Sequence, residues 1–331
     1  MTPLVGQGGS HIVRRCFAAI AALAVLAAAP LVRAQNAGQP IDDPEANVVE
    51  ELVVNAKLPG PAWWKVSDGD TTVYILGVPG AVPKGMTWDT SVLDRRLDGA
   101  FTLITPPQAR AGLTDLPALL SMRSKLKADR PLDQVAPDLA PRLARAWAAT
   151  GHKDDDWKDW KPLGAGLMLA GYAVRKSGLT DAEPDKTIEK LARKHKVKAK
   201  PAAVYKAMPM IKTLVKQHSE EAGLICLEGV IDEVEAGPEP VRRAARAWAN
   251  GEVRAAVHAP RQGQRCVMAL PGMAEEFRRM SAAQVEAVSQ AMKTPGKAVA
   301  VFSLRGLVAE DGVLEKLRAR GFKVTTPDSA N

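Results

Sequence analysis

The sequence has 331 residues, of which 46% are hydrophobic and 25% are charged, a composition that excludes disordered and fibrous proteins. The formal net charge is +8 at pH 7, from 45 basic and 37 acidic residues. Three arginines and no acidic residue lie within residues 1–34, so the rest of the chain has 42 basic residues and a net charge of +5. So small an excess permits weak attraction to anionic surfaces and argues against a nucleic-acid-binding function.

Residues 1–34 have the pattern of a secretory signal peptide. Arg14 and Arg15 precede an apolar run over residues 16–32, and Val32-Arg33-Ala34 offers a small-x-small cleavage site. We therefore expect an exported protein, periplasmic or secreted, with no transmembrane segment after cleavage. The alternative is an uncleaved N-terminal membrane anchor, which the shortness of the apolar run disfavours.

Two of the three cysteines, Cys226 and Cys266, lie outside this leader. An exported protein meets an oxidising compartment, and one pair of cysteines allows one connectivity. We expect a disulfide that closes a loop of about 40 residues. The alternatives are two unpaired buried thiols and, less favoured because no histidines are suitably spaced nearby, a metal site.

The segment after the leader, residues 35–60, is polar and contains proline, which predicts a flexible acidic linker. We expect the folded domain to span residues 61–325 and to be followed by a C-terminal tail, residues 326–331. The acidic bias of the linker comes from five residues: Asp42, Asp43, Glu45, Glu50 and Glu51.

The folded part begins with a predicted β-hairpin over residues 61–80. Trp64 and Val66 alternate with polar neighbours, residues 67–70 have turn chemistry, and residues 72–76 are rich in β-branched and aromatic side chains. The second strand ends in the bend Gly77-Val78-Pro79-Gly80. Because open α/β sheets bind ligands at the carboxyl ends of their strands, this bend is a candidate site.

Helices and strands alternate through the rest of the chain, which predicts an α/β fold with a sheet covered by helices. The clearest buried strand, residues 298–303, ends in a second bend, Leu304-Arg305-Gly306, and the two bends could face one site. Other strands are expected at residues 99–104, 200–205 and 322–324, and helices at residues 89–96, 113–127, 139–149, 163–174, 208–218, 222–234, 241–250, 277–292 and 312–320.

A basic segment, Lys186–Lys200, has two interpretations. It is either a patch for an anionic ligand or membrane surface, or a solvated helix face around Ile188 and Leu191. No aromatic residues interleave the charges, as single-stranded nucleic-acid binding would require. Only Glu189 interrupts its basic residues, which are Lys186, Lys190, Arg193, Lys194, His195, Lys196, Lys198 and Lys200.

Several segments resemble the TraB/GumN family. The resemblance is carried by residues 64–77 with Val82-Pro83-Lys84-Gly85, by residues 300–324, and more weakly by Trp160-Lys161-Pro162 and residues 247–251. It implies a mixed, mainly parallel central sheet with a helical insertion in the middle. The family is similar to the Tiki-type metalloproteases and the erythromycin-esterase-like proteins, which are expected to use two Gly-x-x-His turns and glutamates around a divalent metal that activates water.

At the two turns, this chain departs from the family pattern. Gly80 stands three residues after Gly77, where the first histidine is expected. Gly306 stands in place of the second histidine, with Ser303 near the family's glycine. A glycine has no side chain to bind a metal.

The two carboxylate positions are also changed. Thr105 stands where a glutamate would end a strand, and Tyr205 is the approximate match to a glutamate on the central strand. The resemblance therefore predicts a degenerate pocket with no metal ligand, no cofactor and no catalytic residue. Its positions are Gly77, Gly80, Thr105, Tyr205, Ser303 and Gly306.

Other residues could rebuild a site. Ser303 at a strand-end turn is a candidate nucleophile, although no Gly-x-Ser-x-Gly elbow is present. A second candidate is a cluster for a hard cation, or alternatively a solvated helix start, formed by His152, Asp154, Asp155, Asp156 and Asp159.

Three functional hypotheses follow. The first is a non-catalytic family member, a pseudoenzyme that serves as a binding or scaffold protein. The second is a metal-dependent hydrolase or peptidase that holds a divalent metal with substitute ligands. The third is a module that binds an anionic surface through Lys186–Lys200. The partners expected are a peptide ligand or an anionic surface, and not nucleic acid.

Overall fold

The computed structural model describes residues 41–152, 154–258 and 261–327. The predicted signal peptide, residues 1–34, lies outside the described residues, as do the first part of the predicted linker and most of the predicted tail. Within the described ranges, no helix combines the length and apolar character needed to cross a membrane.

The elements have the following bounds. The strands are β1 (Trp63–Ser67), β2 (Thr71–Val78), β3 (Val82–Pro83), β4 (Leu103–Thr105), β5 (Gln108–Arg110), β6 (Leu179–Thr180), β7 (Ala199–Pro201), β8 (Val204–Lys206), β9 (Gly296–Ser303) and β10 (Lys323–Thr325). The α-helices are α2 (Ser91–Leu97), α3 (Leu116–Lys125), α4 (Leu132–Val135), α5 (Ala140–Ala149), α6 (Pro162–Ser177), α7 (Glu183–Lys194), α8 (Ala207–Gln217), α9 (Glu220–Ala236), α10 (Glu239–Ala249), α11 (Val253–Val257), α12 (Gln262–Ala269), α13 (Met273–Ala291), α14 (Leu304–Val308) and α15 (Val313–Ala319). Short 3₁₀ turns are η2 (Glu50–Leu52), η3 (Leu113–Asp115) and η4 (Asp156–Asp159).

A six-stranded sheet in the order β10-β1-β2-β9-β4-β7 forms the centre of the fold. β2, β9, β4 and β7 pair in parallel, whereas β1 is antiparallel to both β2 and β10. The predicted α/β fold with a mixed, mainly parallel sheet is therefore confirmed.

The predicted hairpin forms because its turn residues satisfy their own backbone. The Asp68 carboxylate accepts hydrogen bonds from the amides of Asp70 and Thr71, at 3.3 and 3.0 Å. The turn pairs β1 with β2, from Trp63 opposite Leu76 to Ser67 opposite Thr72. Trp64 is fully buried, so the hairpin contributes one of the largest side chains of the core.

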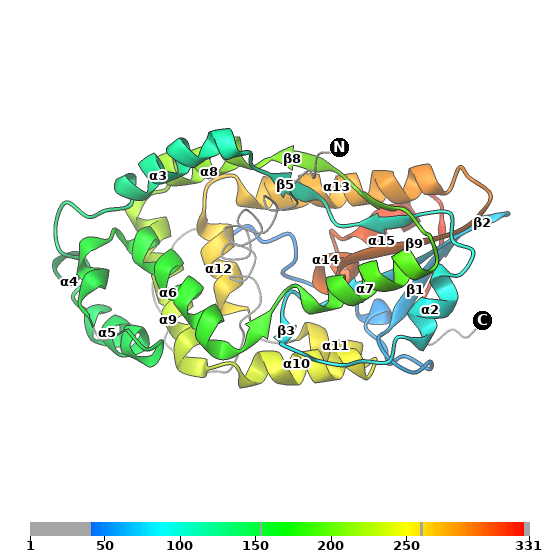
Figure 1. The fold of residues 1–331 in the computed structure, drawn as a ribbon, viewed down its shortest axis with the longest axis horizontal. Helices are drawn as coiled ribbons and strands as arrows, with labels where there is room; N and C mark the ends of the chain where they lie inside the picture. The colour runs from blue at the N-terminus through cyan, green and yellow to red at the C-terminus, as the bar shows by residue number, and fades with distance from the viewer. Residues whose placement is uncertain (1–40, 153, 259–260, 328–331) are drawn as a thin grey trace, which may run out of the picture.

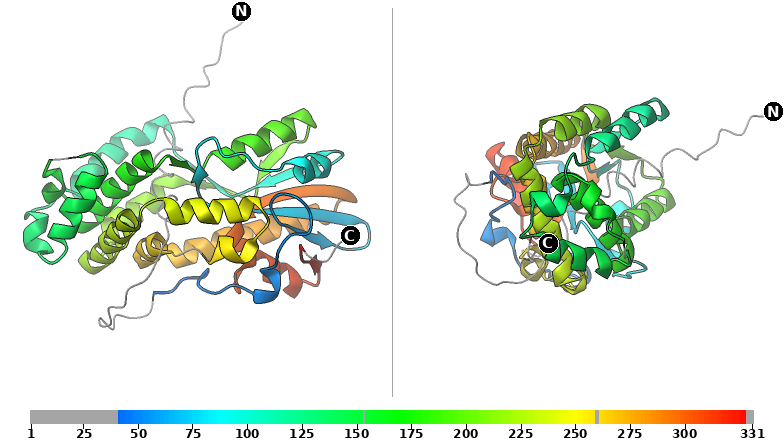
Figure 2. Two further views of the ribbon diagram at one scale, coloured as in Figure 1. Left: turned by 90° about the horizontal axis from the view of Figure 1, so that it is seen from below. Right: turned by 90° about the vertical axis from the view of Figure 1, so that its left-hand side faces the viewer.

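Helices cover both faces of this sheet (Figures 1 and 2). The α2 and α7 helices pack together on one face, and α13 and α15 pack on the other. The central strands β2 and β9 are consequently buried along most of their length, as parallel strands covered on both faces are. The α10 and α11 helices run along one side, below the sheet in Figure 1.

A helical lobe extends beyond the carboxyl ends of the parallel strands (Figure 1). It is built from α3 to α6, α8, α9 and α12, and it has its own core around Trp147, Leu163 and Leu227. The α6 and α9 helices approach closely at Gly166, where a side-chain carbon would lie 3.4 Å from the Leu227 backbone. This lobe is the helical insertion that the family resemblance implies.

Cys226 and Cys266 connect two helices of this lobe. Cys226 lies on α9 and Cys266 on α12, both fully buried, and their sulfur atoms are 2.04 Å apart, a disulfide bonding distance. The pairing expected from the cysteine count is thus compatible with the fold.

Residues 41–60 differ from the flexible linker that the composition predicts. Leu52 and Val53 are buried in the core that surrounds the sheet. The Val49 amide donates to the Val308 carbonyl at 2.9 Å, and the Ala56 amide donates to Gly251 at 2.9 Å. We call residues 41–56 the acidic strap, because they cross the domain surface as part of the fold and carry five acidic residues.

The first prediction concerns the disulfide. A cross-link between residues 40 apart should contribute about 4 kcal/mol in the chain-entropy model. We expect a reductant to lower the Tm of the oxidised protein in differential scanning fluorimetry. The Cys226→Ala/Cys266→Ala variant is the control, since its Tm should be low and insensitive to reductant. Equal melting of the oxidised and reduced wild type would contradict the bond.

The second prediction concerns Glu233, a 2% exposed carboxyl on α9 that accepts a hydrogen bond from the Gly263 amide. Burial raises its pKa well above the usual 4.5, although the Gly263 amide opposes that shift. The folded state therefore binds a proton more tightly than the unfolded state, and stability falls as pH rises through the window above 4.5. We expect Glu233→Gln to raise Tm at pH 8 and to have a smaller effect near pH 4, as measured by thermal melts across pH. An equal effect at both pH values would contradict this account.

Candidate functional site

The two predicted bends lie side by side. The β2 and β9 strands pair in parallel, with Gly77 opposite Phe302 and Val78 opposite Ser303. Both strands therefore end at the same level of the sheet, and the segments that follow them share the carboxyl edge. This is the place where α/β sheets present ligand-binding residues.

Apolar packing fills the first bend. A side-chain carbon at Gly77 would lie 2.6 Å from the Leu304 Cδ1 atom, 3.1 Å from the Leu304 Cα atom and 3.2 Å from the Trp64 ring. The Trp248 indole nitrogen donates a 2.7 Å hydrogen bond to the Gly77 carbonyl. The void between these residues is too small for a water molecule. Gly80 follows two residues after the end of β2 and is exposed.

The second bend is filled by a carboxylate from the acidic strap. Ser303 ends β9 and is exposed, and α14 begins directly after it. A side-chain carbon at Gly306 would lie 2.6 Å from the Glu45 Oε1 atom and 3.8 Å from the Ser303 hydroxyl. Glu45 thus lies against the position where the family resemblance places the second histidine.

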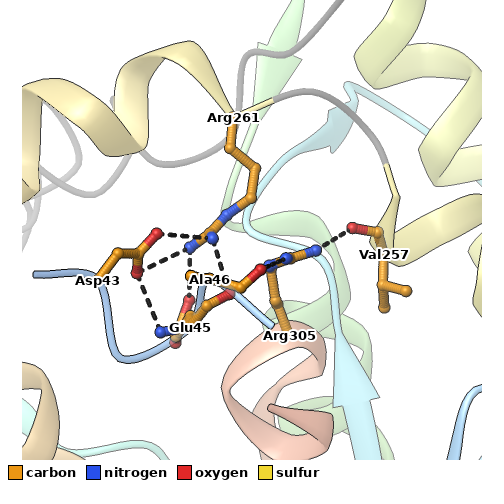
Figure 3. Close-up of polar contacts among 6 residues, drawn as sticks. All are labelled: Asp43, Glu45, Ala46, Val257, Arg261 and Arg305. Atoms are coloured by element: carbon orange, nitrogen blue, oxygen red, sulfur yellow. Dashed lines mark hydrogen bonds and ion pairs between the residues drawn. The ribbon is translucent and has the colours of Figure 1, made fainter. Parts of the chain in front are cut away.

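Two arginines hold this part of the strap (Figure 3). Arg261 contacts the Asp43 carboxylate at 2.7 Å and the Glu45 carboxylate at 3.4 Å, and it donates to the Glu45 carbonyl at 2.7 Å. Arg305 donates to the carbonyls of Glu45 and Ala46, at 2.8 and 2.6 Å. Its third hydrogen bond, 2.5 Å long, goes to the Val257 carbonyl. The side chains of Asp43, Glu45 and Arg261 are only 17–18% exposed, so the cluster is largely shielded from water.

Burial shifts the titration of two groups in this cluster. It raises the pKa of Glu45, and the positive charge of Arg261 opposes the increase. Burial and the nearby Arg261 lower the pKa of Arg305 to about 10, so Arg305 stays protonated at neutral pH. Two adjacent guanidinium groups at this depth need neighbouring anions, and the strap supplies Asp43 and Glu45.

Thr105 and Tyr205 lie in different sheets. Thr105 ends β4, on the far side of β9 from β2, and it pairs with Pro201 of β7. Tyr205 lies on β8 opposite Ala109, in a separate two-stranded ribbon past the end of β7. The Arg279 guanidinium stacks over the Tyr205 ring at 4.9 Å.

The pocket residues do not fit the divalent metal that the resemblance implies. Gly80, Gly306 and Thr105 supply no imidazole or carboxylate. The carboxylate at the second bend, Glu45, is already paired with Arg261. A second cation, Arg305, lies beside it and would repel a metal ion. Within the described ranges, no three His, Cys, Asp or Glu side chains gather where they could hold a metal.

The alternative cation cluster around His152 serves the structure of the helical lobe. The His152 ring stacks on Tyr172 with ring centroids 3.7 Å apart. Asp154 accepts a 3.0 Å hydrogen bond from the Trp147 indole, and Asp155 pairs with Lys158 at 2.7 Å. These carboxylates therefore have partners other than a shared ion.

The basic segment Lys186–Lys200 is partly neutralised by acids. Lys194 and His195 both contact Asp94, at 2.8 and 2.9 Å. Lys186 lies 3.5 Å from Glu183, and Arg193 lies 3.7 Å from Glu189. Exposed lysines remain at positions 190, 196, 198 and 200.

A comparison with models of protein families identifies the family of the chain. The model of the TraB/PrgY/gumN family matches residues 62–326, which is most of the sequence. The chain belongs to the TraB/PrgY/gumN family. Comparisons with curated proteins and with solved structures give no match. In this family member, the acidic strap lies before the matched region, and Arg261 and Arg305 lie within it.

Sequence reasoning missed the contribution of the strap. Its acidic residues were assigned to a linker, and Arg261 and Arg305 lie more than 200 residues later in the chain. The available signal was the charge of residues 42–51, which carry five acids and no basic residue in a protein with a basic surplus. Such a segment is a candidate to pair with a basic surface of its own domain.

The third prediction compares the glycines of the two bends. Gly77→Ala would press against the Leu304 backbone and should cost about 1–3 kcal/mol, because neither element can move freely. Gly306→Ala is the matched control, since it meets the movable end of the Glu45 side chain and should cost less. Urea unfolding followed by tryptophan fluorescence measures both. A larger loss for Gly306→Ala would refute this account of the first bend.

Proposed function

We propose that this TraB/PrgY/gumN protein is an exported, non-catalytic family member that serves as a binding or scaffold protein. One observation carries the proposal. The Glu45 carboxylate of the chain's own strap lies against Gly306, where the family resemblance places a histidine, and Arg261 pairs with it. The space next to the second bend is therefore taken by a salt bridge.

The electrostatics of the carboxyl edge favour this proposal over a metal-dependent hydrolase. A hydrolytic metal needs several neutral or anionic ligands and an open coordination position. At this edge, Arg305 brings a positive charge, and Trp248 and Leu304 close the space beside Gly77. No cluster elsewhere in the described ranges supplies substitute ligands.

Export is supported by the leader pattern of residues 1–34 and by the cysteine pair. A disulfide between Cys226 and Cys266, which lie on neighbouring helices, would suit a protein that folds in an oxidising compartment.

The fourth prediction tests the absence of a metal-dependent reaction. We expect the mature protein, purified without chelators, to carry no stoichiometric zinc, manganese or cobalt in elemental mass spectrometry. EDTA should leave its Tm unchanged, because no ion holds the two bends together. Stoichiometric metal that EDTA removes, or peptide cleavage that EDTA abolishes, would overturn the proposal and favour the hydrolase.

A further inference from the structure

Each acidic residue of the strap contacts an arginine of the domain. Asp42 pairs with Arg278 at 2.6 Å, and Asp43 and Glu45 pair with Arg261. Further along, Glu50 contacts Arg254 at 2.5 Å, and Glu51 contacts Arg318. These arginines come from α11, α13, α15 and the start of α12, so they converge on the strap from separate parts of the chain. The strap thus follows a complementary row of positive charges.

The two halves of the strap are held differently. The rear half, residues 48–56, is anchored by the buried side chains of Leu52 and Val53. The front half, residues 42–46, has no buried apolar side chain and is held by ion pairs and hydrogen bonds to Arg261, Arg278 and Arg305. We call these three residues the arginine site. Another chain with carboxylates and carbonyls could form the same polar contacts, whereas the rear anchor belongs to the core.

The arginine site contacts both side chains and main chain of its occupant. Arg261 binds carboxylates two residues apart, Asp43 and Glu45. Arg305 binds two successive backbone carbonyls, those of Glu45 and Ala46. The next residues pair with the domain as a short strand would, with Val48 opposite Ala309. The front half of the strap forms a turn, in which the amides of Glu45 and Ala46 donate to the Asp43 carboxylate and the Asp43 carbonyl, at 2.9 and 3.0 Å. Carboxylates at this spacing beside two successive carbonyls are features of an acidic polypeptide, and a polysaccharide lacks the successive carbonyls.

We propose that the arginine site binds an acidic peptide turn from a partner protein, and that the front half of the strap is its internal occupant. The proposal rests on the proposed function, because a site that holds a metal and substrate could not also hold the strap. A partner segment displaces residues 42–46 by forming the same ion pairs, while residues 48–56 stay in place. The partner segment competes with the front half of the strap, which is tethered to the domain and therefore has a high effective concentration at the site. The intact strap thus keeps the affinity for the partner segment low.

The experiment removes the charges of the occupant and leaves the site intact. In the mature chain, Asp43→Asn/Glu45→Gln keeps the side-chain shapes and removes the two carboxylates that Arg261 binds. The probe is a fluorescent peptide with the sequence of residues 41–47, measured by fluorescence anisotropy. The peptide control is a neutral peptide in which Asn replaces both Asp42 and Asp43 and Gln replaces Glu45, so that all three acidic side chains are removed. Asp138→Asn/Glu228→Gln, which changes two exposed acids of the helical lobe, is the matched protein control for net charge.

We expect Asp43→Asn/Glu45→Gln to bind the acidic peptide at least tenfold more tightly than the wild type or the matched control does. Adding Arg261→Gln to this variant should weaken its binding of the acidic peptide at least tenfold. The neutral peptide should bind Asp43→Asn/Glu45→Gln at least tenfold more weakly than the acidic peptide does. Equal binding by all variants, or binding that Arg261→Gln leaves unchanged, would overturn the proposal. If thermal melts show that the double variant is unfolded, Asp43→Asn alone takes its place, with the same two outcomes.

Two further readouts identify the source of the peptide and separate this proposal from the proposed function. A concentration-dependent dimer in light scattering that Asp43→Asn/Glu45→Gln lacks would identify the strap of a second copy as the partner segment. A monomer that binds the peptide points to another protein. Elemental analysis of the same preparation measures its metal content. If the protein contains stoichiometric metal and still binds the peptide, only the non-catalytic function is overturned. If the protein is free of metal and does not bind the peptide, only the peptide site is overturned.

Discussion

The parallel pairing of β2 with β9 is the constraint on which the candidate site depends. It joins the first hairpin to a strand more than 200 residues later and brings Val78 level with Ser303. The bends at Gly77 and Gly306 become neighbours only through this pairing. Because both strands are covered by helices, the carboxyl edge is the part of the sheet where side chains can be presented to a ligand. In this protein that edge has been filled, by Trp248 and Leu304 at one bend and by Glu45 at the other.

The parts of the fold that depend on local pattern were predictable. The hairpin follows from turn chemistry at residues 67–70, and β9 follows from a continuous apolar run. The arrangement around Tyr205 was not predictable, because the expected strand over residues 200–205 is divided into β7 and β8, and only β7 belongs to the central sheet. The β7 strand ends at Pro201, which pairs with Thr105. A break of two residues between short strands leaves no signal in hydrophobic periodicity.

The strap was beyond sequence reasoning for a different physical reason. An acidic segment has the composition of a disordered linker unless a fixed basic surface compensates its charge. Arg261, Arg278 and Arg305 are far from it in sequence, and nothing near them predicts that they converge. Long-range charge pairing depends on the tertiary fold, and a single sequence does not carry that information in its local pattern.

Glycine at position 306 and glutamate at position 45 constrain each other. A histidine at position 306 would meet the Glu45 carboxylate, so this side chain would have to leave its present position before an imidazole could occupy the bend. Conversely, withdrawal of the strap would leave Arg261 and Arg305 side by side without their anions, at a cost that another carboxylate must offset. A metal site at this edge would therefore require a histidine, a different position for the Glu45 side chain and the loss of at least one guanidinium. Because these changes are coupled, no single substitution would create a metal site here while Asp43 and Glu45 pair with Arg261.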